Sequence, residues 1–414
     1  MALLRAVGTA AWALIVVSAH AQSVLPLKLA DAKSRLLTEN LGILASKYDI
    51  ANAEAEAVQA RVWNNPNFVW NSDMYNVEKN QYLNYKNQVL IQLEMLVPFN
   101  GRFHKAAAAA DQNVVIQKAL FENMLRELVY EFSLTYHDLA VGQQRAVLYH
   151  EMEQLYDKLI DAARMQYEVG AIAGSELQRL RSEQLAIHAE QLENELLCAQ
   201  LESKIKTLLY LKHDVKIQTE WSTIPVGSLA PLGQLMAEMP TKRSDYQASL
   251  ASISYHKKNI NLQKALALGD VKLGYQPHDR GSNYVRPYQG IVVEVPLPTF
   301  NRNQGQIMIA QNQLKQAQIE VLQLENEMKN ELSSIYTQCI MVDKTLQDYS
   351  LSRIEEVRTM SANATSNYSK RNLSLLEYID LQRIYKQTLS DYLSVKKQQL
   401  DAYATLNYVT GTTN

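Results

Sequence analysis

Two acidic residues near the end of the chain, Glu377 and Asp380, have the type and spacing that could act on cations. They lie in the segment Leu375-Leu376-Glu377-Tyr378-Ile379-Asp380. In a helix, a separation of three places both carboxylates on one face. If three copies of the chain surrounded one pore, these carboxylates would form two stacked acidic rings, and such rings favour cations. The alternative is a solvated helix face, the usual environment of Glu and Asp.

Little else in the sequence could do chemistry. The eight histidines are scattered without a His-x-x-x-His pair, and no phosphate-binding glycine loop is present. The two cysteines, Cys198 and Cys339, fall within helical patterns and are interpreted as small residues in packed helix seams. We therefore expect neither catalysis nor a resident metal or cofactor. The net charge of -2, without a basic run, argues against a nucleic-acid partner.

The sequence elements that contain these residues are duplicated in the chain. The segment Ile91 to Asn100 recurs as Ile291 to Asn301, with an offset of 200 before the proline and 201 after it. Tyr167 and Glu176 match Tyr368 and Glu377 at the same offset of 201. A tandem duplication predicts two copies of one long unit. The predicted organisation is a signal peptide at 1–21, a first repeat at 22–212, a linker at 213–231 and a second repeat at 232–414.

The N-terminus has the pattern of a secretion signal. Arg5 precedes an apolar run from Ala10 to Val17, and Ala19-His20-Ala21 is a small-x-small cleavage site. The run is shorter than the roughly 20 residues that a membrane-spanning helix needs. No later segment is long and apolar enough to be such a helix, so we expect export beyond the inner membrane and, if the chain enters a membrane, insertion through β-strands.

Long helices should dominate, because the 414 residues include only 14 glycines and 10 prolines. From Ile307 to Cys339 apolar residues recur in alternating steps of three and four, the pattern of a coiled coil, with a slip of one residue before Leu332. A single helix from Asn303 to Tyr368 would be about 100 Å long. Further helices are predicted at 29–62, 102–167, 175–211, 232–268 and 374–408.

Four segments instead alternate with a period of two, which predicts strands with one apolar and one polar side. They begin near Phe68, Val89, Val271 and Ile291. Each repeat thus contributes one hairpin with strands of roughly 10 residues, the length of an outer-membrane strand. Four strands cannot close a barrel in lipid, because two edges would stay unpaired. A trimer would supply twelve strands, with Glu94 and Glu294 facing a water-filled interior.

The secretion signal, the repeated arrangement of helix, hairpin and helix pair, and two strand-exit motifs together resemble the TolC-type outer-membrane efflux factors over the whole mature chain. The exit motifs are Val97-Pro98-Phe99-Asn100-Gly101-Arg102 and Pro296-Leu297-Pro298-Thr299-Phe300-Asn301-Arg302-Asn303-Gln304-Gly305. The second motif is similar to that of the CzcC-like heavy-metal branch. The resemblance implies a mainly α protein with membrane β-structure: a trimeric channel whose twelve-stranded barrel continues into a long α-helical periplasmic tunnel.

The exit motifs would form the junction between barrel and tunnel, since proline ends a strand ladder and Asn100 or Asn301 can cap the next helix. The junction residues are Pro98, Asn100, Gly101, Pro298, Asn301 and Gly305. The resemblance also assigns the reversal of each helix pair to a periplasmic tip that contacts an adaptor protein. These tip residues are Gly170, Ala171, Ile172, Arg371, Asn372 and Leu373. In the second tip, Arg371 and Asn372 replace glycine and alanine.

By the same resemblance, Glu377 and Asp380 line the tunnel constriction as gate and selectivity residues. The implied partners are two further copies of the chain, a periplasmic adaptor, an inner-membrane efflux pump of the RND type and outer-membrane lipid. The predicted function is a passive exit duct for small solutes, with heavy-metal cations as one cargo. A duct for drugs or proteins would have the same fold, and a coiled-coil structural protein of the envelope is the rival from another class.

Overall fold

The computed structural model describes residues 24–72, 74–76, 80–82, 89–220, 229–279 and 286–412. The expected signal peptide lies outside these residues. The described helices are α1 (Leu29–Glu39), α2 (Leu41–Gln59), α3 (Arg102–Glu168), α4 (Gly174–Leu208), α5 (Leu232–Lys242), α6 (Ser244–Leu266), α7 (Gln304–Asp348), α8 (Leu351–Ser369) and α9 (Leu375–Thr410). The described strands are β1 (Val24–Leu27), β2 (Asn67–Ser72), β3 (Tyr75–Asn76), β4 (Gln81–Tyr82), β5 (Val89–Val97), β6 (Lys216–Thr219), β7 (Val271–Asp279) and β8 (Tyr288–Glu294).

The chain divides into two compact units, one formed by Met1–Arg35 with Asp138–Thr223, the other by Leu36–His137 with Ile224–Asn414. These units divide the chain differently from the predicted repeats, which concern sequence similarity and remain a prediction.

The first unit joins a helical pair to a short parallel sheet. The C-terminal part of α3 packs on α4, where the Asn194 amide donates to the Gly142 carbonyl at 2.9 Å. Strands β1 and β6 pair in parallel. The Gln143 side chain fastens β6 to α3, because its amide nitrogen donates to the Ile217 carbonyl at 2.8 Å and its oxygen accepts from the Thr219 amide at 3.0 Å. No strand was predicted at β1 or β6, since four residues are too few to show an alternating pattern.

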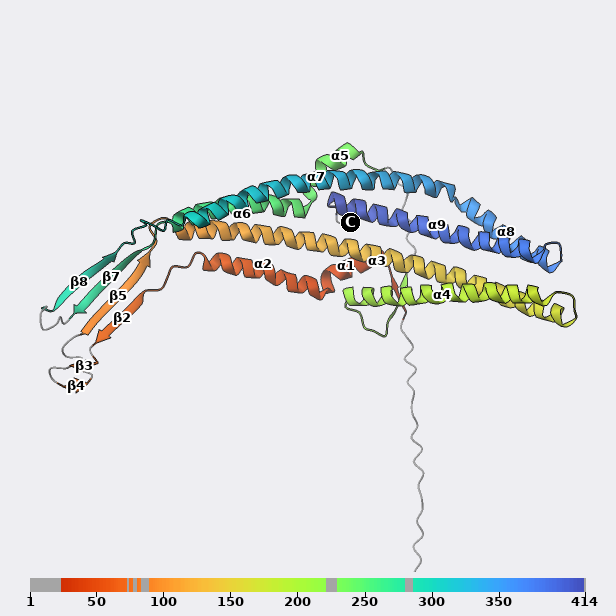
Figure 1. Cartoon of the computed structure of the whole chain (residues 1–414), viewed down its shortest axis with the longest axis horizontal. Helices are drawn as coiled ribbons and strands as arrows, with labels where there is room; N and C mark the ends of the chain where they lie inside the picture. The colour runs from red at the N-terminus through yellow and green to blue at the C-terminus, as the bar shows by residue number, and fades with distance from the viewer. Residues whose placement is uncertain are drawn as a thin grey trace, which may run out of the picture. The chain divides into compact units, whose positions relative to one another are not determined.

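The second unit contains the coiled-coil seam that the heptad pattern predicts. In Figure 1, α7 runs beside α6 along its first part and beside α9 further on. Most of the predicted seam positions are buried on α7, while Ile307, Leu314 and Leu324 are half-buried. One core cluster joins this helix to α5 and α9. Its buried members are Met239, Met328, Leu332, Ile335, Cys339, Ala402, Leu406 and Val409. The seam continues past Leu332, as the predicted slip in register requires.

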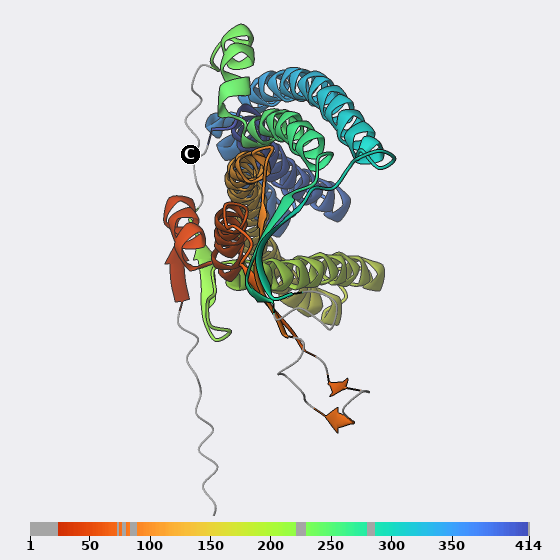
Figure 2. The same cartoon turned by 90° about the vertical axis from the view of Figure 1, so that its left-hand side faces the viewer.

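The same unit carries a four-stranded antiparallel sheet in the order β2-β5-β7-β8. The predicted hairpins are β2 with β5 and β7 with β8, and pairing of β5 with β7 joins the two repeats. Figure 2 shows the separate β3–β4 ribbon, a pair of two-residue strands that the sequence did not predict. Strands β2 and β8 have six and seven residues, shorter than the predicted length.

Three helices that the sequence predicts as continuous are interrupted. The run from Asn303 to Tyr368 breaks at Tyr349 and Ser350, and the Ser350 hydroxyl caps α8 by accepting from the Arg353 amide at 3.4 Å. Asn40 likewise separates α1 from α2, and Arg243 separates α5 from α6. The single-helix predictions were wrong at these three places because apolar periodicity continues through each break and gives no signal of it. Side-chain caps start the second helix at two of the breaks, through Asn40 and Ser350, whereas Arg243 makes no side-chain cap hydrogen bond.

Within the described residues, no helix is both long enough and apolar enough to cross a membrane.

Candidate functional site

The four-stranded sheet has two chemically different faces. One row of side chains crosses all four strands in register, from Phe68 through Leu93 and Tyr275 to Ile291. These side chains are 69%, 51%, 50% and 78% exposed. A continuous apolar row with this much exposure marks an interaction surface or a lipid-facing surface. The alternation predicted for β5 and β7 is therefore present in the sheet.

The opposite face of the sheet carries a ladder of polar side chains. The Lys272 ammonium lies 3.4 Å from the Glu94 carboxylate and 3.0 Å from that of Glu294, so one cation bridges three strands. The Gln92 amide donates to Glu94 at 3.0 Å and accepts from Gln276 at 3.1 Å. The Glu294 side chain remains 66% exposed, so this charged ladder lies on a solvent-accessible face of the sheet.

Both sheet-to-helix junctions use a residue in the left-handed conformation. Gly101, with φ 61°, precedes the first residue of α3, and Asn303, with φ 57°, precedes the first residue of α7. The predicted junction residue Gly305 instead lies inside the first turn of α7 and does not adopt this conformation. An asparagine tolerates this conformation better than most residues.

The capping roles expected for the junction asparagines differ from those in the structure. The N-cap of α7 is Asn303, and its side chain donates to the Gln263 carbonyl at 2.9 Å instead of capping the helix. Asn301 accepts from the Asn303 amide at 3.1 Å and lies two residues before the N-cap of α7, so it does not cap this helix. Asn100 donates to the Ala265 carbonyl at 3.3 Å. Asn100 and Asn303 tie the two junctions to α6.

The two predicted tips are the turns that connect α3 to α4 and α8 to α9, and each is closed by the same pair of backbone hydrogen bonds. In the first turn, Gly170 N donates to the Tyr167 carbonyl at 2.9 Å and Ala171 N to the Gln166 carbonyl at 2.8 Å. In the second turn, Arg371 N donates to Tyr368 at 3.0 Å and Asn372 N to Asn367 at 2.9 Å. This is the Schellman arrangement. Ile172 and Leu373 are half-buried, and the other tip residues are exposed.

The two predicted gate residues differ in their local contacts. The Glu377 carboxylate accepts from the Ser374 amide at 3.0 Å and from its hydroxyl at 2.6 Å, and the Ser374 hydroxyl accepts from the Glu377 amide in return. The Ser374 hydroxyl therefore lowers the pKa of Glu377. Asp380 lies exposed one turn further along α9. Glu377 thus has a local structural role in the single chain, which the prediction did not include.

Behind these carboxylates a buried polar cluster joins α8 to α9. The Gln382 side chain is fully buried, accepts from the Ser361 hydroxyl at 2.7 Å and donates to the Ser361 carbonyl at 3.1 Å. The Tyr378 ring stacks on Tyr368 with 4.9 Å between ring centroids, and burial raises the pKa of Tyr378 to about 12. This cluster holds the α8–α9 hairpin together. Its signal in the sequence is only a polar residue at an apolar helix position.

A second buried cluster links α3, α6, α7 and α9 around two arginines. The Arg243 guanidinium binds the Asp245 carboxylate at 2.5 Å and Glu331 at 2.9 Å. Arg126 binds Asp245 at 3.1 Å, donates to the Tyr408 carbonyl at 3.0 Å and lies over the Tyr408 ring. Both arginine side chains are almost fully buried. No sequence pattern predicted this cluster, because its members lie far apart in the chain.

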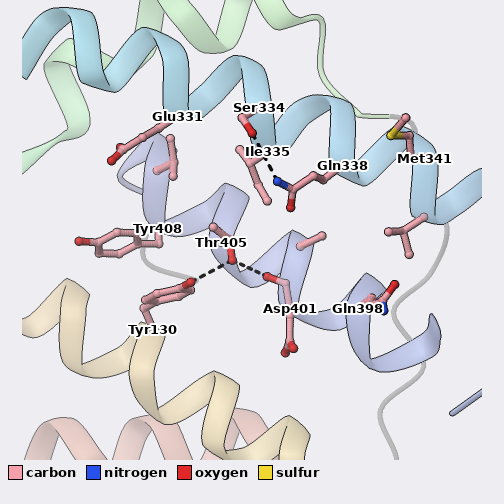
Figure 3. A pocket seen from close by; sticks show the side chains of 13 residues that line it. Tyr130, Glu331, Ser334, Ile335, Gln338, Met341, Gln398, Asp401, Thr405 and Tyr408 are labelled. Carbon is pink, nitrogen blue, oxygen red and sulfur yellow. Dashed lines mark hydrogen bonds between the residues drawn. The ribbon is translucent and has the colours of Figure 1, made fainter. Parts of the chain in front are cut away.

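Beside this cluster a groove of about 740 Å³ opens between α7 and α9 and reaches Tyr130 of α3. Figure 3 shows Thr405 at its centre, where its hydroxyl lies 3.1 Å from the Tyr130 hydroxyl and donates to the Asp401 carbonyl at 2.7 Å. The Tyr130 and Tyr408 rings stack at 4.5 Å along one side of it. The lining mixes apolar, hydroxyl and carboxylate groups, without a nucleophile placed beside a base.

In the described part of the chain, no three His, Cys, Asp or Glu side chains come together as metal ligands. Cys198 and Cys339 are free thiols, and burial raises the pKa of Cys339 to about 11.

Comparison with solved structures defines the class of fold. The chain is similar to the outer-membrane channel CmeC of Campylobacter jejuni, with 11% identity, a TM-score of 0.77, and coverage of 93% of this chain and 85% of that one. The outer-membrane protein VceC of Vibrio cholerae is 14% identical, with a TM-score of 0.72 and coverage of 92% of this chain and 96% of that one. CusC is 15% identical, with a TM-score of 0.70 and coverage of 92% of each chain. The chain therefore has the fold of the TolC-type outer-membrane channels, which confirms the predicted fold class.

A curated relative indicates the branch. The chain is 21% identical over 390 residues to the cobalt-zinc-cadmium resistance protein CzcC of Cupriavidus metallidurans, covering 93% of this chain and 90% of that protein. No protein-family model matches the chain. The resemblance to the efflux factors, nearest to the CzcC-like branch, is confirmed by these similarities, and an efflux duct is the function that they support.

Proposed function

We propose that the chain is a passive exit duct of the outer membrane, formed by three copies. Within one chain the sheet ends at two open edges, β2 and β8. Unpaired strand edges are unfavourable in lipid, so the edges of neighbouring copies pair until the barrel closes. Three copies with four strands each give a twelve-stranded barrel, and single-chain bacterial outer-membrane barrels likewise have an even number of strands.

The observation that carries this proposal is the separation of the two faces of the sheet. The exposed apolar row that includes Leu93 and Ile291 suits contact with lipid tails, and the ladder around Lys272 suits a water-filled interior. A structural coiled-coil protein of the envelope would need neither face. Energy comes from an inner-membrane pump of the RND type, since the chain is proposed to be neither an enzyme nor a binder of any cofactor.

The α3–α4 and α8–α9 turns are the proposed contact with a periplasmic adaptor. The start of α9 is the proposed gate. Three copies of Glu377 and Asp380 form two acidic rings that favour cations and narrow the tunnel. The similarity to a cobalt-zinc-cadmium resistance protein supports heavy-metal cations as the cargo. The exit motifs around Pro98 and Pro298 are the proposed junctions between barrel and tunnel.

Single-channel conductance of the purified protein in planar bilayers tests this function. We expect a low, cation-selective conductance from the wild type and a higher or less selective conductance from Glu377→Ala with Asp380→Ala. The matched control is Glu355→Ala with Glu356→Ala, which removes the same charge from the adjacent helix α8 and should leave selectivity unchanged. A folded trimer that inserts no channels would refute the duct. A selectivity change in the control alone would move the constriction elsewhere.

A further inference from the structure

The α3–α4 turn (the first turn) and the α8–α9 turn (the second turn) present different chemistry to a partner. Between Glu168 and Glu176 the first turn contains only small, apolar and hydroxyl residues, including the exposed Val169. The second turn instead presents Lys370 and Arg371, both exposed. The closure of both turns by equivalent backbone hydrogen bonds makes Arg371 the structural counterpart of Gly170. The comparison is therefore between equivalent positions.

Arg371 occupies this position at a conformational cost. Its φ of 61° lies in the left-handed region, as does the φ of 74° at Gly170. Glycine enters this region freely, whereas a residue with a Cβ atom, such as arginine, is disfavoured there. A non-glycine residue held in such a conformation is a reason to look for a function of its side chain.

The charge of the second turn is not neutralised within the described chain. No Asp or Glu occurs from residue 357 to residue 376. The nearest carboxylate along the chain, that of Glu377, accepts two hydrogen bonds from Ser374 in the cap of α9. Neither Lys370 nor Arg371 forms an ion pair in the part of the chain that the structure describes. Two fixed cations thus remain available at the end of the hairpin.

We propose that the second turn binds an acidic segment of the periplasmic partner, with carboxylates paired to Arg371 and Lys370, whereas the first turn makes an uncharged contact. This inference rests on the proposed function, in which the turns meet an adaptor. A guanidinium can bind a carboxylate through two parallel hydrogen bonds, and the Schellman turn holds the Arg371 backbone in one place.

The test uses the full-length trimer in lipid nanodiscs and two synthetic helical-hairpin peptides as probes. One peptide carries three Glu residues at its turn, and the other carries Gln in their place. Both are immobilised densely on a biosensor surface, so that the trimer can engage several copies at once. The variants are Arg371→Gln, Arg371→Gly and Arg371→Lys. The matched control is Arg358→Gln, an exposed arginine on α8 that is paired with Glu355 at 3.4 Å.

We expect the wild type to bind the Glu peptide at least tenfold more tightly than the Gln peptide, with the difference shrinking as salt rises. Arg371→Gln and Arg371→Gly should remove most of this difference, and Arg371→Lys should retain part of it. Arg371→Gly should do so without lowering the melting temperature, because it relieves the backbone cost. Equal binding of both peptides by the wild type, or an equal loss in Arg358→Gln, overturns the inference. Conductance of the same preparation separates this failure from failure of the duct itself.

Discussion

The Glu377 carboxylate and the Ser374 hydroxyl lie 2.6 Å apart, and together these two residues form the capping box that starts α9. The first of the two proposed gate residues is therefore held in place by its own chain, while Asp380 is exposed. This relationship separates the two carboxylates experimentally, because only one of them should affect both helix stability and conduction.

Replacing Glu377 by Gln should lower the melting temperature more than replacing Asp380 by Asn, because only Glu377 supports the cap. The Ser374 hydrogen bonds hold the pKa of Glu377 below its usual 4.5. Its stabilising effect is therefore complete above this value and is lost as the pH falls through the lowered pKa. Melting curves of wild type and Glu377→Gln should differ by a constant amount near neutral pH and converge in acid. A gap that persists in acid would contradict this assignment.

Lysine substitutions at adjacent positions of β8 should separate the two faces of the sheet. Ile291→Lys places a charge in the exposed apolar row and should destabilise the protein in vesicles by roughly 2–4 kcal/mol if the site lies near the bilayer midplane. Val292→Lys points to the opposite face, where a charge meets water. Urea midpoints in lipid vesicles measure both. Equal midpoints for the two variants would mean that the apolar row does not face lipid.

Removing the Asp245 carboxylate should be among the most damaging changes in the helical region. Burial alone raises the pKa of Asp245, but the hydrogen bond from Arg243 and the charge of Arg126 lower it overall, below 3.8. Asp245→Ala leaves two buried arginines without this partner and should cost roughly 3–5 kcal/mol. The stability that Asp245 contributes is present above pH 3.8 and is lost as the pH falls through the lowered pKa, so the deficit should shrink in acid.

Chemical denaturation at neutral and acid pH measures this deficit. The control is Glu238→Gln, which breaks the exposed pair with Lys242 and should change stability little. A small effect of Asp245→Ala at neutral pH would mean that the arginines find other partners.

Two glycines with the same backbone conformation should respond differently to alanine. Gly411 has φ 76°, and a Cβ atom there would lie 2.7 Å from the carbonyl carbon and oxygen of Lys242. Backbone atoms cannot move aside cheaply, so Gly411→Ala should destabilise the protein by roughly 2 kcal/mol or more. Gly170 has φ 74° with open space around it, and Gly170→Ala should cost only about 1 kcal/mol. Melting temperatures of the two variants measure these effects, and equal losses of stability in both would rule out the close contact at Gly411.

The amino-acid sequence by itself determined the kinds of element and their faces. Helix α3 was predicted within one residue at each end, because apolar periodicity and low glycine content act over many turns. The polar and apolar sides of β5 followed from its period of two, and the pairing of each hairpin was predicted from the polar turn between its two strands. The duplicated exit motifs and helical turns also came from the sequence, and they carried the resemblance to the efflux channels.

Only the tertiary structure decided the details that depend on contacts between distant residues. It broke three helices at Asn40, Arg243 and Ser350, although the apolar pattern continues through each. It gathered Arg126 and Asp245 around one buried cluster across more than a hundred residues, and it placed Asn303 rather than Gly305 in the left-handed junction. Local patterns report which side of an element is apolar, whereas caps, buried ion pairs and strained turns depend on which neighbours are present to satisfy them.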